Sequence, residues 1–124
     1  MKKIMNKKFI IIAIIFSMNL VGCMNMPTNP SQITGSYTSG LKYDGFGCDK
    51  LAVEVDSLAR RENQLVIAQE QRIKSSQTQA FWSGQGLGDG IEASELANVR
   101  GEKEAVRKAM EQNKCKFAVN KKTE

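Results

Sequence analysis

The sequence predicts an all-α fold, an antiparallel two-helix hairpin with a glycine-rich turn. Two long segments carry apolar residues at helical spacing, and a run of glycines separates them. Cys48 and Cys115 lie at the outer ends of these segments, where the two ends of a helical hairpin meet. A disulfide there would hold the open end of the hairpin together.

The first helix is expected over residues 49–80. Asp49 suits a helix start, and no glycine or proline interrupts the chain from there to Ser83. The apolar residues fall on one face, less regularly toward the end of the segment: Leu51, Val55, Leu58, Leu65, Ile73 and Ala80.

Residues 83–90 read Ser-Gly-Gln-Gly-Leu-Gly-Asp-Gly and are expected to form a flexible turn between the helices. Repeated glycines also occur in loops that cradle phosphate groups. Here no strand precedes the glycines, no Gly-Lys-Ser/Thr follows them, and the Gly-x-Gly-x-x-Gly spacing is not met. A nucleotide site is therefore disfavoured.

The second helix is expected over residues 91–114. Asp89 and Glu92 fit a capping box, in which the Asp carboxylate accepts from a backbone amide in the first turn. Gly101 lies in the middle of the helix, where glycine costs about 1 kcal/mol relative to alanine. We expect a close helix–helix crossing there; the alternatives are a kink or the approach of a ligand. The buried face is expected to comprise Leu96, Val99, Val106, Ala109 and Met110.

The beginning of the chain carries the features of an export signal. Four lysines precede a short apolar stretch, residues 9–15, which is too short to span a bilayer that takes roughly 20 residues. Leu20, Val21, Gly22 and Cys23 then resemble the lipobox of bacterial lipoproteins at every position. The resemblance implies that residues 1–22 are a signal peptide that is removed, and that Cys23 carries a covalent lipid.

Met24 stands where an Asp would favour retention in the inner membrane, so the resemblance implies the periplasmic face of the outer membrane. Removal of residues 1–22 takes away four of the 18 Lys and Arg but none of the 13 Asp and Glu. The remaining 102 residues carry a net charge of +1, which disfavours nucleic acid as a partner.

Of the three cysteines, Cys23 is the one expected to carry lipid, which leaves Cys48 and Cys115 to pair with each other. Because the periplasm is oxidising, Cys48 and Cys115 are expected to form a disulfide. A redox or metal pair is the alternative, but the chain has no Cys-x-x-Cys motif and no histidine. We therefore expect no metal and no cofactor other than the lipid on Cys23.

The remaining segments flank the hairpin domain of residues 48–115. Residues 23–47 are expected to form a lipidated flexible tether, since they contain both prolines and no helix or strand period. The alternatives for this segment are that part of it docks on the helices or that it binds a partner. Residues 116–124 are expected to be a polar tail.

Residues 43–115 also resemble small helical-hairpin lipoproteins of proteobacteria whose function is unknown. The likeness lies in the order Cys, helix, glycine loop, helix, Cys, and in the segment Glu95 to Glu102, which reads Glu-Leu-Ala-Asn-Val-Arg-Gly-Glu. This resemblance implies no activity.

The function expected from the sequence is that of a non-catalytic outer-membrane lipoprotein that acts by protein–protein interaction or as a structural component of the envelope. A two-helix hairpin leaves apolar surface exposed to solvent, and exposed apolar surface often marks a site that binds a partner. That partner would be an envelope protein or a second copy of the chain. The candidate contact residues are Leu65, Val66, Ile67, Phe81 and Trp82.

Other classes of function remain as alternatives. A pilotin or assembly chaperone of a secretion system is also small, exported and lipidated, and an exclusion lipoprotein would act by blocking a receptor. An enzyme is disfavoured, because the absence of histidine excludes Ser-His-Asp and Cys-His catalysis and no catalytic residue can be assigned.

Overall fold

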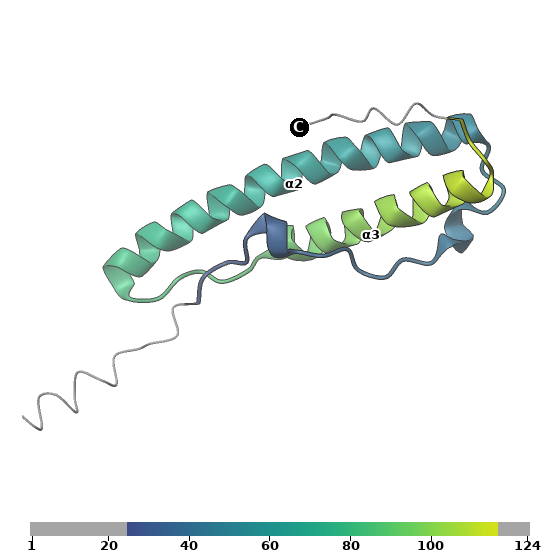
Figure 1. Cartoon of the computed structure of the whole chain (residues 1–124). Coiled ribbons are helices and arrows are strands. Elements are labelled where there is room, and N and C mark those ends of the chain that lie inside the picture. Colours follow the sequence, from purple (N-terminus) through teal and green to yellow (C-terminus); the bar gives the residue numbers. More distant parts are fainter. Residues whose placement is uncertain (1–24, 117–124) are drawn as a thin grey trace, which may run out of the picture.

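The computed structural model describes residues 25–116, and within this range it is an antiparallel helical hairpin with no strand (Figure 1). Helix α2 spans Cys48–Ser83 and helix α3 spans Ile91–Gln112. Two short 3₁₀ helices, η1 (Pro30–Gln32) and η2 (Gly40–Tyr43), precede them. The all-α hairpin predicted from the sequence is therefore confirmed, whereas the predicted signal peptide, Cys23 and residues 117–124 lie outside the described residues.

The helix ends differ from the predicted ones by a few residues. Helix α2 continues to Ser83 and ends where Gly84 adopts a left-handed φ of 77°, a conformation that suits glycine. It begins at Cys48, so Asp49 lies in the first turn and is not the cap. Helix α3 ends at Gln112, and Lys114 then turns the chain with a φ of 51°.

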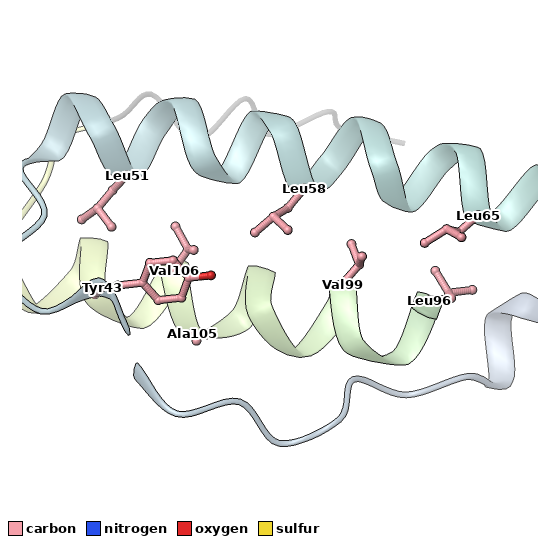
Figure 2. Packing of buried hydrophobic residues seen from close by; sticks show 9 residues of the cluster. Tyr43, Leu51, Leu58, Leu65, Leu96, Val99, Ala105 and Val106 are labelled. Carbon is pink, nitrogen blue, oxygen red and sulfur yellow. The ribbon is translucent and has the colours of Figure 1, made fainter. Parts of the chain in front are cut away.

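The core is a single seam between the two helices (Figure 2). Leu51, Leu58 and Leu65 recur every seven residues along α2, so they point toward α3. Leu96, Val99 and Val106 face them from α3. The predicted apolar face of α3 is confirmed, since Ala109 is also buried and Met110 packs against the cluster.

The two helices have unequal lengths, so the far end of α2 extends past α3. At 1.5 Å per residue, 36 residues of α2 make about 54 Å and 22 residues of α3 make about 33 Å. The helices are level at the Cys48 end, and the chain from Gly84 to Gly90 runs back along α2 (Figure 1). On this part of α2 the buried residues become small or polar: Gln69, Ser76 and Ala80.

Residues 25–47 correct the prediction of a flexible tether. They are irregular, as expected, but they lie along α3 as a third layer rather than as a spacer (Figure 1). The Ser36 amide donates to the Ala97 carbonyl oxygen at 2.8 Å. Arg100 donates to the carbonyl oxygens of Pro30 and Ile33. Tyr43 is fully buried in the core, beside the edge of Phe46.

Gly101 allows the N-terminal segment to pack closely against α3; it does not lie at the predicted crossing of the two helices. A Cβ atom at position 101 would lie 1.8 Å from the Ser36 carbonyl oxygen. Gly35 approaches from the other side, where a Cβ atom would lie 2.9 Å from the Gly101 amide nitrogen. The cost of a glycine inside α3 is thus offset by backbone contact with the N-terminal segment, residues 25–47.

Candidate functional site

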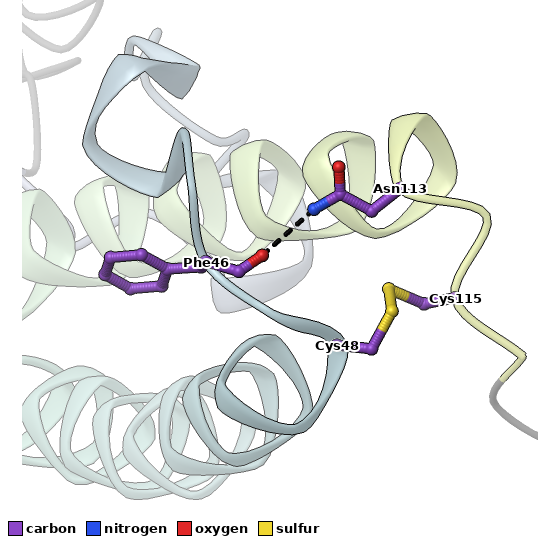
Figure 3. The surroundings of a disulfide bond; sticks show 4 residues. All are labelled: Phe46, Cys48, Asn113 and Cys115. Carbon is purple, nitrogen blue, oxygen red and sulfur yellow. Dashed lines mark hydrogen bonds between the residues drawn. A yellow bond between two sulfur atoms is a disulfide. The ribbon is translucent and has the colours of Figure 1, made fainter.

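The disulfide predicted from the sequence is present, between Cys48 and Cys115 (Figure 3). The two Cα atoms lie 5.5 Å apart, and the bond closes a loop over a sequence separation of 67 residues. In the chain-entropy model a loop of this length contributes about 4 kcal/mol to stability. Asn113 supports the same end by donating from its side-chain amide to the Phe46 carbonyl oxygen at 3.0 Å.

The glycine-rich loop joins the two helices, as the sequence predicts, and the start of the N-terminal segment is bonded to it. The Gly88 amide donates to the Asn25 carbonyl oxygen at 2.8 Å. Gly88 has a left-handed φ of 65°, and a Cβ atom there would lie 2.5 Å from the Asn25 side chain. The Leu87 amide donates to the buried Ser76 hydroxyl at 2.8 Å. These bonds hold loop, helix and segment together.

A cluster of polar side chains, which we call the loop clamp, comprises Thr28, Gln69, Arg72, Asp89 and Glu92. The Thr28 amide and hydroxyl donate to the two Asp89 carboxylate oxygens at 2.6 and 2.5 Å. Gln69, which is fully buried, donates to Asp89 at 2.8 Å and to the Thr28 carbonyl at 2.9 Å. The hydrogen bond from the Thr28 hydroxyl is the main reason why the pKa of Asp89 is lowered.

The loop clamp replaces the predicted capping box. Gly90, not Asp89, is the residue that caps α3, and no side chain caps the helix there. The Asp89 carboxylate is occupied by Thr28 and Gln69, and Glu92 pairs with Arg72 at 3.8 Å. Arg72 also donates to the Gly88 carbonyl oxygen at 2.8 Å. The acidic groups therefore join three chain segments, which is a structural role.

A second charged cluster joins the helices near their middle. Glu62 on α2 accepts hydrogen bonds from Arg100, at 2.8 Å, and from Lys103, both on α3. Burial by itself would raise the pKa of Glu62, but the hydrogen bonds from Lys103 and Arg100 lower it below its usual value. Arg100 also binds the N-terminal segment, so this cluster connects all three layers.

The five residues predicted to contact a partner do not form one surface. Leu65 is part of the core, because it faces Leu96 across the seam, and Val66 is half-buried against that core. These two residues are therefore corrected to structural roles. Ile67 is 56% exposed, and Phe81 and Trp82 are each 81% exposed near the end of α2.

A groove along α3, within the described part of the chain, was not predicted from the sequence. It has a volume of about 540 Å³ and lies between α3 and residues 35–40. Tyr37 borders it and is 95% exposed. The small buried residues Gly101, Ala105 and Ala109 of α3 line it. The exposed ion pair of Glu104 and Lys108 also borders it.

No group of three metal-binding side chains occurs among residues 25–116. In the same range, neither helix combines the length and the apolar character that crossing a membrane requires. No protein-family model, curated protein or solved structure matches the chain.

The Glu62 cluster predicts a specific dependence of stability on pH. Because the pKa of Glu62 is lower in the folded state, this residue stabilises the fold fully above the pKa of an unfolded glutamate, and the stabilisation is lost as the pH falls through the folded-state pKa. Glu62→Gln should therefore lower the free energy of unfolding by about 2 kcal/mol near neutral pH. It should also flatten the loss of stability in acid, as measured by urea unfolding across that range.

Glu104→Gln is the matched control, since within residues 25–116 Glu104 pairs with the exposed Lys108 alone, at 3.7 Å. Its effect should stay below about 0.5 kcal/mol. Equal stability and equal pH dependence of Glu62→Gln and the unchanged protein would contradict this role of Glu62.

Proposed function

We propose that this protein is a lipoprotein of the bacterial outer membrane, held at the periplasmic face by acyl chains on Cys23, and that it acts by binding another protein rather than by catalysis. The observation that carries the proposal is the lipobox-like match of residues 20–23, directly followed by a segment that is packed into the domain. Two or more acyl chains make such an attachment durable.

The position of Asn25 indicates how the domain would be oriented relative to the proposed anchor. Asn25 lies two residues after Cys23 and accepts a hydrogen bond from Gly88 in the glycine-rich loop. The N-terminal segment then runs along α3 toward the disulfide (Figure 1). An acyl group on Cys23 would therefore leave the disulfide end directed away from the attachment point.

The groove along α3 is the surface that best suits a protein partner. Tyr37, which is 95% exposed, belongs to the segment that forms one wall of the groove, and Leu41, which is 77% exposed, directly follows that segment. Aromatic residues such as tyrosine are enriched at protein interfaces. The partner would be a different envelope protein or a second copy of this chain.

The anchor can be tested by the intact mass of the protein isolated from cell membranes. The expected product begins at Cys23 and carries the added mass of acyl chains, while Cys23→Ser should abolish both the cleavage and the lipid. A membrane-bound product that retains Met1 and has no acyl mass would contradict the proposed anchor.

The partner surface can be tested by placing a photo-crosslinking amino acid at Tyr37 in living cells. We expect a discrete crosslinked product, whose mass distinguishes a second copy from a different envelope protein. The matched control is Val53, which is 68% exposed on α2, a helix that does not line the groove. Equal crosslinking at both positions, or none at Tyr37, would contradict a partner in the groove.

A further inference from the structure

We infer that the overhanging end of α2, with Phe81 and Trp82, is a second membrane contact that lies in the headgroup region of the same bilayer that holds Cys23. This inference rests on the proposed anchor. Phe81 and Trp82 would contact lipid. The groove along α3 would then lie on a different part of the domain, away from the membrane-facing end.

The first observation is the exposure of two adjoining aromatic side chains. Phe81 and Trp82 are each 81% exposed, and their rings meet edge to face with centroids 5.2 Å apart. Neither belongs to the core, because the turn of α2 on which they lie extends past the beginning of α3. Tryptophan is enriched at membrane–water interfaces, where its apolar ring and polar N–H group are both satisfied.

The second observation is the absence of charge around these rings. The sequence from Ser75 to Gly88 contains no charged residue, in a chain that is 25% charged. The next acidic group, Asp89, is occupied by hydrogen bonds from Thr28 and Gln69. A surface of Gln, Ser, Thr, Gly and aromatic side chains can enter a headgroup layer without the cost of desolvating a charge.

The third observation is that the first described residues of the N-terminal segment are bonded close to this end of α2. Asn25 is bonded to Gly88, and Met26 contacts the Ser76 hydroxyl, with 3.7 Å between oxygen and sulfur. Cys23 precedes Asn25 by two residues, and two residues of extended chain span at most about 7 Å. Trp82 lies six residues beyond Ser76 on the same helix, about 9 Å along its axis. The attachment point and the two rings thus belong to the same end of the domain.

The experiment uses the chain that begins at Cys23, which contains every described residue, with the Cys48–Cys115 disulfide intact. The free thiol of Cys23 is coupled to a maleimide headgroup lipid in vesicles of phosphatidylethanolamine and phosphatidylglycerol. Trp82 is the sole tryptophan, so its fluorescence reports on this surface alone. Coupling should shift its emission to shorter wavelength, lower its quenching by acrylamide and allow quenching by lipids brominated near the headgroups.

The matched control moves the tryptophan to the other end of α2. The double variant Trp82→Phe with Val53→Trp places it at a position that is also exposed, at 68%, near the disulfide end. Its emission should not change on coupling and brominated lipids should not quench it. Phe81→Ser should weaken the lipid quenching of Trp82, whereas Leu41→Ser should leave it unchanged.

Two results would overturn the inference. One is a Trp82 emission that coupling leaves unchanged. The other is a shift that brominated lipids do not quench and that grows with protein density, which would assign the surface to a second copy. Because the thiol is coupled chemically, these results are independent of natural acylation. A missing acyl mass in cells would instead contradict the proposed anchor.

Discussion

Backbone contact between the N-terminal segment and α3 is the constraint on which the rest of the structure depends. A hairpin of two helices has one buried seam, and the opposite side of α3 would face water without a third layer. Here the Ser36 amide reaches the Ala97 carbonyl, and Gly35 and Gly101 allow the two backbones to approach. Arg100 then binds both the segment and Glu62, so a single side chain links the segment to α3 and to α2.

This arrangement determines how the proposed anchor would orient the domain. A flexible tether would allow the hairpin to take any direction relative to the membrane. A segment bonded to Gly88 at its start and buried at Tyr43 leaves only a short stretch of chain after Cys23. The glycine-rich loop would then lie near the bilayer, and the groove beside Tyr37 would lie farther along α3. Under the proposed anchor, the orientation of the domain and the position of the groove would thus follow from this one set of contacts.

The parts of this structure that sequence could predict are those with a local pattern. The seven-residue spacing of Leu51, Leu58 and Leu65 indicated the core face of α2. The outer positions of Cys48 and Cys115 indicated the disulfide. The first signal depends on helix geometry, and the second depends on the ends of a hairpin together with the oxidising compartment that the export signal implies.

The parts that sequence missed are contacts between distant segments. The docking of residues 25–47, which the sequence suggested only as an alternative to a tether, uses backbone groups, and these leave no periodic pattern in the sequence. Asp89 fitted a local cap, but Thr28, which is 61 positions away, competes for its carboxylate and binds it. One signal was available, because Gln69 lies four residues after Leu65 on the core face, where a polar residue indicates a buried hydrogen-bond partner.

Hydrogen exchange at the backbone amides of Ser36 and Gly88 tests the central claim most directly. Ser36 donates to Ala97, and Gly88 donates to Asn25, so both amides report the docking of the N-terminal segment. If the segment is part of the folded domain, both amides should exchange slowly, together with the core amides of α3. Exchange of both at the rate of an unfolded chain, while α3 remains protected, would show that the segment is a free tether and would contradict the account.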